Sequence, residues 1–487
     1  MNESIEIGWA SASITPDRPC YVYGQIYYRI SSYVHDPITA TVLVITNDEE
    51  QTIFLSADMV GINDAIREKV KNALKGFDGL DVSKITFSAT HTHNSTYCVD
   101  ERRSAIIAYA GEDILPVMKK SENFMDEAEA LNYVSEIFVQ LIKDAWSSRK
   151  PGGVSFASDY AAIGFNRRPQ FVTRDDAVES KMYGDCSRPD FIKFEGTVDH
   201  GIDMLYTWDI DRNLTGVLVD IPCPSQVFEL HSFISADYWG YARSAIRERL
   251  GNIFVLSICG AAGDQNPLDL ARISKDNVKE LEAWNAQAGE VFRNFDMAEE
   301  CEAIAERIAE PVCRGLKTAM KNIERRPVFK HTVKQITLPI RKVTEADYKE
   351  AETQVREIVS EFSFENRMTG KDLVRIFEPL GIVNRYMLQQ KEDGHTIQSN
   401  IIRLGDVAFC TNPFELFVEY GLRVRARSKA RQVFNMQLTN GQPGYLPTEA
   451  ALAGGSYSSK PASTLVGLDG GKILTETLIA EINKLWE

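Results

Sequence analysis

The segment from Ile85 to Tyr97, "ITFSATHTHNSTY", places two histidines one residue apart at the end of a strand-like run. The chain has only 7 histidines in 487 residues, so the pair stands out. Alternate side chains of an extended segment point the same way, and we therefore expect His91 and His93 on one side and Thr92 on the other. Two imidazoles on one side can share a metal ion or a substrate.

Acidic residues follow several other strand-like runs. Asp58 closes "IFLSAD", Asp264 follows "NIFVLSICGAAG" and Glu415 follows "VAFCTNPF". An aspartate after a strand is often a turn former or a helix N-cap, so each position alone is a weak signal. Because α/β folds place their sites at the ends of strands, the group as a whole predicts a functional site there.

The elements that position these residues read as an α/β fold. β-Branched runs that stop at polar or glycine-containing turns predict strands, and helical patterns fall between several of them. From Met125 to Trp146, apolar residues recur at three- and four-residue steps, which predicts a helix with one buried stripe. We find no long linker and therefore expect one domain over 1–487, with a subdivision near Arg326 as an option. The predicted strands include "TATVLVIT", "QTIFLSAD", "KITFSAT", "GVLVDIP" and "NIFVLSICG".

Composition narrows the classes of partner. A formal net charge of −15 argues against nucleic acid, which needs a basic face. The N-terminal stretch has no secretory pattern and no apolar run reaches membrane-spanning length, so we expect a cytoplasmic protein without a membrane anchor. The 8 cysteines are scattered without CxxC pairs, which favours reduced thiols over disulfides or a thiolate zinc site. The expected partner is a small-molecule substrate.

An ordered series of motifs resembles the neutral (non-lysosomal) ceramidase family. The resemblance spans Gly8 to Tyr457 and implies a mixed-sheet α/β catalytic domain, here without the family's C-terminal β-sandwich domain. It also implies a zinc amidohydrolase that cuts an N-acyl bond with a metal-bound water. The motifs are "GWASASITPD", "FSATHTHNS", "FISADYWGYAR", "CGAAGDQNP", "NPFELFVEYG" and "GYLPT" with "GGSY".

The resemblance also implies roles for single residues. The family's zinc ligands match His91, Glu415 and Tyr445, and its substrate-side histidine matches His93. A further active-site tyrosine matches Tyr457, which follows Tyr445 by twelve residues. The family's active-site arginine corresponds most nearly to Arg167 in "GFNRRP". We expect the carboxylates of Asp58, Asp237 and Asp264 to orient the metal ligands without binding the metal themselves.

One ligand of the family is missing. Cys223, Pro224 and Ser225 stand where the family has a histidine, in "IPCPSQVFELHSFISADYWG". We predict that His231, further along the same connection, replaces it as the fourth metal ligand. A loop histidine bonded to a backbone carbonyl is the alternative reading of this residue. Zinc is the expected ion, and Mn²⁺ and Fe²⁺ are also compatible with such donors.

The missing ligand and the expected cytoplasmic location favour a soluble amide or ester, sugar-linked substrates included, over a two-tailed lipid. Two rival interpretations stay open. A TIM-barrel amidohydrolase could use His91, His93, His200, His231 and Asp264 in that order. A non-catalytic carbohydrate- or acyl-binding relative could have kept the fold after losing the ligand at "CPSQ".

Overall fold

A large mixed sheet forms the centre of the computed structural model, which describes residues 4–98, 101–273 and 297–487. The strand order is β14-β13-β12-β7-β1-β4-β5-β6. The β13–β14 and β5–β6 pairs at the two edges are parallel, and the five pairs between them are antiparallel. The strands are β1 (Glu6–Ser13), β4 (Thr39–Thr46), β5 (Gln51–Ala57), β6 (Ile85–Ala89), β7 (Lys150–Tyr160), β12 (Gly201–Asp209), β13 (Leu214–Ile221) and β14 (Phe254–Cys259).

A second sheet of four strands packs against the first. Its order is β16 (Phe329–Pro339), β17 (Gly394–Leu404), β18 (Val407–Thr411) and β20 (Gln432–Met436). Side chains of both sheets form one core between them, in which Phe54 lies 5.2 Å from Phe409 and Phe409 stacks on Phe434 at 4.3 Å. Strands buried on both faces read as continuous apolar runs, which is why "VAFCT" (β18) was recognisable in the sequence.

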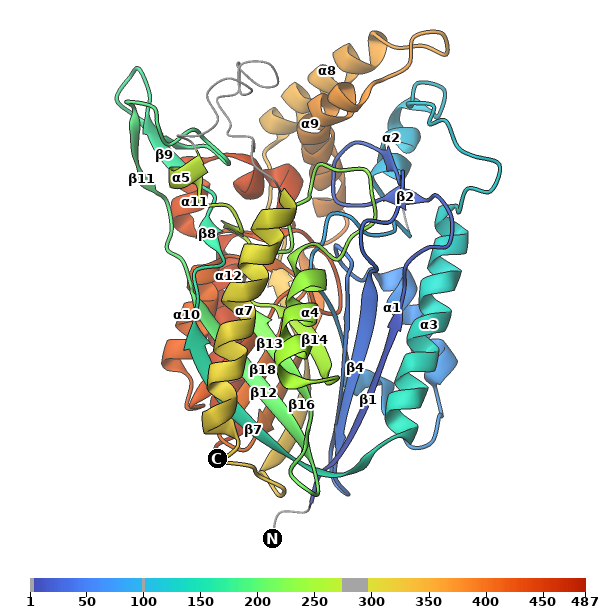
Figure 1. The fold of residues 1–487 in the computed structure, drawn as a ribbon. Coiled ribbons are helices and arrows are strands. Elements are labelled where there is room, and N and C mark those ends of the chain that lie inside the picture. Colours follow the sequence, from blue (N-terminus) through green and yellow to red (C-terminus); the bar gives the residue numbers. More distant parts are fainter. Residues whose placement is uncertain (1–3, 99–100, 274–296) are drawn as a thin grey trace.

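Helices cover the outer faces of both sheets (Figure 1). Helices α1 (Asp64–Leu74) and α3 (Glu127–Ser147) pack on β1, β4, β5 and β6, while α4 (Tyr238–Leu250) and α7 (Met297–Ala319) cover the other half of the large sheet. Helices α10 (Val418–Arg427) and α12 (Leu468–Lys484) cover the small sheet. The layers therefore run helix, sheet, sheet, helix, as expected for two sheets that each bury both faces.

Smaller elements gather at one end of the layers (Figure 1). A three-stranded sheet, in the order β10-β9-β11, lies on one side of this end, and the helix pair α8 (Glu345–Ser360) and α9 (Gly370–Gln389) lies at the same end away from it. The remaining elements are β2 (Tyr21–Val22), β3 (Arg29–Ile30), β8 (Phe165–Asn166), β9 (Pro169–Val172), β10 (Val178–Ser180), β11 (Phe191–Phe194), β15 (Gln265–Asn266), β19 (Glu415–Leu416), β21 (Tyr445–Leu446), α2 (Glu101–Ala110), α5 (Leu270–Ile273), α11 (Glu449–Gly454), η1 (Val82–Lys84), η2 (Tyr457–Ser459) and η3 (Pro461–Ser463).

The mixed α/β fold predicted from the sequence is confirmed, and the TIM-barrel alternative is wrong. Such a barrel needs eight parallel strands, whereas most pairs of the large sheet are antiparallel. The subdivision near Arg326 stays a prediction, although the chain passes there from α7 on one sheet to β16 in the other. Within the described ranges, none of the helices combines the length and the apolar character that crossing a membrane requires.

Candidate active site

His91 lies just beyond the end of β6 and has a left-handed backbone, with φ of 66°. The sequence-based prediction assumed that the backbone is extended through His91 and His93, and this assumption is wrong. The His91 amide donates to Met59 O at 2.9 Å, and its Nδ1 lies 2.7 Å from Val60 O. A carbonyl accepts only from a protonated nitrogen, so Nδ1 carries the proton. In a neutral ring the lone pair of Nε2 can then bind a metal ion.

His93 nevertheless faces the same point as His91. The two Nε2 atoms are 3.4 Å apart, with the rings inclined by 69°. On its other sides, His93 Nε2 lies 2.6 Å from Gln226 Nε2, and His93 Nδ1 lies 3.7 Å from Glu229 Oε2. Gly24, with φ of 119°, lets the chain pass against this ring, because a Cβ there would lie 2.5 Å from His93 Cβ.

Glu415 and Tyr445 reach the histidines from the small sheet's side of the molecule. Their short strands, β19 and β21, pair in parallel with Glu415 opposite Tyr445. Glu415 Oε2 lies 3.3 Å from His91 Nε2. Burial acts to raise the pKa of the Glu415 carboxyl, but His91, Arg167 and a hydrogen bond from Tyr445 together hold it below its usual value. Burial raises the pKa of the Tyr445 phenol well above its usual value, so its hydroxyl is a donor.

Arg167 brings a buried positive charge to the same cluster. Its guanidinium carbon lies 5.4 Å from the centre of the Tyr445 ring, and its Nη2 donates to Gly263 O at 3.0 Å. Tyr457, in η2, places its ring 5.6 Å from that of Tyr445. The structure therefore brings together the five residues to which the resemblance gave active-site roles around His91. These residues are His93, Glu415, Tyr445, Tyr457 and Arg167.

Asp264 joins the segments that carry Arg167 and Glu415. Its two carboxylate oxygens accept from Val418 N at 2.9 Å and from Asn166 Nδ2 at 3.0 Å. Burial raises its pKa to about 6, against hydrogen bonds that act to lower it. The neighbouring Gly263 is required because a Cβ there would lie 2.3 Å from Glu415 O. These contacts fit the predicted positioning role of Asp264.

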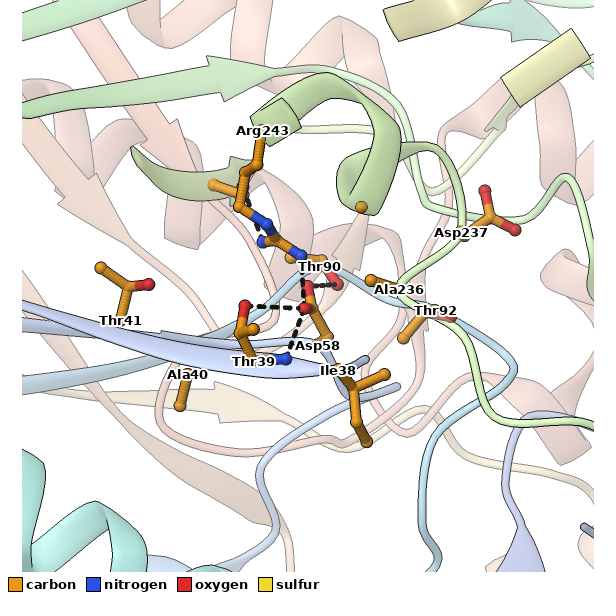
Figure 2. A network of polar contacts seen from close by, with 12 residues as sticks. Ile38, Thr39, Ala40, Thr41, Asp58, Thr90, Thr92, Ala236, Asp237 and Arg243 are labelled. Atoms are coloured by element: carbon orange, nitrogen blue, oxygen red, sulfur yellow. Dashed lines mark hydrogen bonds and ion pairs between the residues drawn. The ribbon is translucent and has the colours of Figure 1, made fainter. Parts of the chain in front are cut away.

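Asp58 acts on the strand end that precedes His91 (Figure 2). It is fully buried and forms an ion pair with Arg243 of α4. Its oxygens also accept from Thr39 N at 2.8 Å and from Thr90 Oγ1 at 3.3 Å. The carboxylate thus ties three elements to the residue before His91.

Asp237 fixes the connection that follows β13. It is the N-cap of α4, where its Oδ1 accepts from Tyr238 N at 2.8 Å, and its Oδ2 accepts from Phe228 N at 2.7 Å. A hydrogen bond to a backbone amide nine residues earlier holds the loop at Phe228. Asp237 therefore positions the segment that contains Gln226 and Glu229.

His231 is not brought to this cluster by its side chain. The ring is exposed and stacks on Phe233 at 4.9 Å, while its Nε2 lies 3.1 Å from Met297 Sδ. Only the backbone of His231 faces the site, since its carbonyl accepts from Arg29 and from Asn94. The position gives no support to the predicted role as fourth ligand. His200, the other histidine of the barrel interpretation, packs near Phe165 at 6.1 Å.

Sequence reasoning missed the residues that complete the cluster. Gln226 stands in the segment where the family's second histidine was expected, and Asn266 Nδ2 lies 3.3 Å from its Oε1 and donates to Tyr183 OH at 2.8 Å. Arg29 joins this loop to the histidines, because it donates to Glu229 O at 3.0 Å and to His93 O at 2.6 Å. The motif "CGAAGDQNP" contains Asn266, but nothing local signalled Arg29, Tyr183 or Gln226.

The side-chain atoms of His91, Glu415 and Tyr445 fit a metal ion with three protein ligands. In a tetrahedral site with bonds of about 2.0–2.1 Å, ligand atoms are about 3.3–3.4 Å apart, and His91 Nε2 and Glu415 Oε2 are 3.3 Å apart. Tyr445 hydrogen-bonds to Glu415 and would be the third donor. In the described ranges no three His, Cys, Asp or Glu side chains form a ready metal site, and Tyr445 is of none of these residue types.

Comparison with known proteins identifies the fold. Neither a protein-family model nor a curated protein sequence matches the chain. The structure resembles the neutral ceramidase of Pseudomonas aeruginosa with a TM-score of 0.66 at 17% identity, over 99% of this chain and 74% of that one. It also resembles a ceramidase complexed with C2, with a TM-score of 0.66 at 15% identity, over 99% and 75% of the two chains. This chain therefore has the fold of the neutral ceramidases.

Proposed function

We propose that this protein is a metal-dependent hydrolase that cleaves an amide or ester bond, with His91, Glu415 and Tyr445 as the metal ligands. The observation that supports it is the meeting of His91 Nε2 and Glu415 Oε2 at 3.3 Å, on segments more than 300 residues apart in sequence. The neutral-ceramidase fold adds support, because ceramide contains an N-acyl amide bond. Zinc is the first candidate, and Mn²⁺ and Fe²⁺ are alternatives.

The residues around the metal position have distinct chemical roles in this proposal. A bound zinc would lower the pKa of its water to about 7 and polarise the acyl oxygen. Arg167 and Tyr457 would donate hydrogen bonds to the oxyanion, where each donor in a buried site contributes a few kcal/mol. His93 would carry the proton to the leaving group, with its ring held between Gln226 and Glu229.

The substrate we propose is a soluble amide or ester, with sugar-linked compounds among those to be tested. A cytoplasmic location belongs to the same proposal. Both extend the expectations drawn from the sequence, in which the formal net charge is −15. Long-chain and short-chain N-acyl substrates should therefore be assayed side by side.

Metal content and hydrolysis, measured on the same protein samples, test the proposal. His91→Ala should lose both bound zinc and activity, whereas His93→Ala should keep the metal and lose turnover. His395→Ala is the matched control, because this histidine lies on β17 away from the cluster, and it should change neither quantity. Wild-type protein that hydrolyses its substrate equally well after complete metal removal would contradict the proposal.

His231→Ala distinguishes the two possible ligand sets. Retention of metal would agree with the contacts of His231 with Phe233 and Met297 and with a three-ligand site. A loss of metal affinity of ~10-fold or more would instead support the sequence-based prediction. A wild-type chain that purifies without metal and hydrolyses none of the substrates would favour the non-catalytic binding relative.

A further inference from the structure

A buried ion pair, Arg168 with Glu195, adjoins the candidate site, because Arg168 directly follows Arg167 in the chain. Both side chains are almost inaccessible, at 0% and 2% exposure. The pairing is bidentate, with Arg168 Nε 2.8 Å from Glu195 Oε1 and Arg168 Nη2 3.0 Å from Glu195 Oε2. A buried ion pair gives little net stability compared with apolar residues of the same volume, so its presence calls for another explanation.

The guanidinium of Arg168 also binds the loop that carries Tyr457. Its Nη1 donates to Ser458 Oγ at 3.0 Å, and its Nη2 donates to Ala451 O at 3.3 Å and to Gly455 O. These acceptors are more than 280 residues away in sequence and lie on both sides of the turn before Tyr457. Only the planar, five-donor fork of arginine can serve a carboxylate and three further acceptors together.

The turn that Arg168 holds is strained. Gly455 and Ser456 both have left-handed backbones, with φ of 73° and 75°. This conformation is costly for serine and persists only where the surroundings enforce it, which is common at functional sites. Ser456 Oγ accepts from Met182 N at 3.0 Å, so the small β10-β9-β11 sheet and its connections hold this residue too.

Arg168 is placed to couple the two halves of the site. Its chain neighbour Arg167 contacts Tyr445, and Arg167 O accepts from Tyr183 N at 3.0 Å. The Arg168 guanidinium lies 5.7 Å from the Phe417 ring, two residues after Glu415. Glu195 is itself anchored, because its amide donates to Arg168 O at 2.9 Å and its carboxylate accepts from Ser180.

We propose that Arg168 and Glu195 are positioning residues that hold the strained 454–458 turn and thereby aim Tyr457 at the substrate. This role rests on the proposed hydrolase function, since Tyr457 acts there on the oxyanion. Neither residue touches the reacting atoms. We call the Arg168–Glu195 pair with its bonds to the turn the clamp. Loss of the clamp should let the turn relax and move the Tyr457 hydroxyl, and a misplacement of about 1 Å can cost ~100-fold in rate.

Arg168→Lys is the main test, because lysine keeps the charge beside Glu195 but cannot span the acceptors on the turn. We expect kcat/KM to fall by about 10- to 100-fold with bound metal unchanged, towards the value of Tyr457→Phe. Ser458→Ala leaves the ion pair intact and should produce a smaller loss in the same direction. Arg425→Lys is the matched control, because Arg425 also serves two acceptors at once, bridging Asp199 and Asp203 at 2.8 and 3.0 Å.

A second measurement reports on the turn without using activity. Chymotrypsin cleavage after Tyr457, followed by mass spectrometry of the fragments, should be about tenfold or more faster in Arg168→Lys and unchanged in Arg425→Lys. Wild-type kcat/KM and wild-type cleavage in both Arg168→Lys and Ser458→Ala would overturn the clamp. Equal effects in Arg425→Lys would overturn it as well, because they would indicate general destabilisation. If the wild-type chain hydrolyses nothing, the proposed function fails, and the cleavage rates alone decide on the clamp.

Discussion

The Asp58–Arg243 pair offers a direct test of how the strand ends that carry the site are held together. Asp58→Asn preserves the shape of the side chain but removes the charge. The side chains are 0% and 7% exposed, so Arg243 would remain buried with neutral partners such as Ser257 Oγ at 3.3 Å and no negative charge beside it. Removing one member of a buried pair costs about 3–5 kcal/mol, because the remaining charge is left uncompensated. Against a total stability of about 5–15 kcal/mol this is a large loss.

A double substitution separates the charge effect from the hydrogen bonds. In Asp58→Asn with Arg243→Met, the side-chain amide oxygen still accepts from Thr39 N, and no buried charge remains. We therefore expect the double variant to regain at least about 2 kcal/mol relative to Asp58→Asn alone. Urea unfolding followed by the fluorescence of the 6 tryptophans measures each free energy of unfolding.

Surface ion pairs provide the comparison for this result. Arg249→Met removes the partner of Glu306, whose side chain is 62% exposed, and should change stability by about 1 kcal/mol or less. If Asp58→Asn costs less than about 1 kcal/mol, or if the effects of Asp58→Asn and Arg243→Met simply add, the uncompensated charge is not the cause and the reasoning is refuted.

Two further predictions concern the segment 263–264. The folded-state pKa of Asp264 is about 6, above the ordinary value of 3.8, so its contribution to stability is present below about pH 4 and is lost as the pH rises through 6. The difference in free energy of unfolding between the wild type and Asp264→Asn, measured by urea titration, should therefore decrease by up to ~3 kcal/mol from pH 4 to pH 7. A difference that does not change with pH would contradict the burial of this carboxyl. Gly263→Ala should lose about 1–3 kcal/mol and bound metal, because its Cβ would lie 2.3 Å from Glu415 O, whereas Gly467→Ala, with neighbours at 3.5 Å or more, should keep its metal.

Much of the framework could be predicted from local patterns. The run "TATVLVIT" is β4 residue for residue, and the stripe from Met125 to Trp146 is α3 to within two residues. These segments are buried on both faces or on one stripe, so their burial is written directly into the order of apolar residues. The antiparallel pairs at the centre of the large sheet could not be read in this way, because strand direction depends on which partners meet.

The sequence by itself determined which segments end at the site. The strands before Asp58, His91, Asp264 and Glu415 were recognisable, and the ordered motifs indicated Arg167, Tyr445 and Tyr457. Burial patterns depend on neighbouring residues, and motif order depends only on position along the chain. Both therefore survive in a sequence of low overall similarity. The strand ends before these residues, and the 12-residue spacing of the two tyrosines, were therefore available without coordinates.

Only the tertiary structure decided which side chains of the connection between β13 and α4 face His91 and His93. Gln226 points to His93 while the His231 ring turns to Met297, because Asp237 holds Phe228 N and Arg29 holds the carbonyls of Glu229 and His231. The Arg29 contacts join residues about 200 positions apart. Side-chain direction in an irregular loop has no periodicity, so it follows from such long-range hydrogen bonds and cannot be read from the residues of the loop alone.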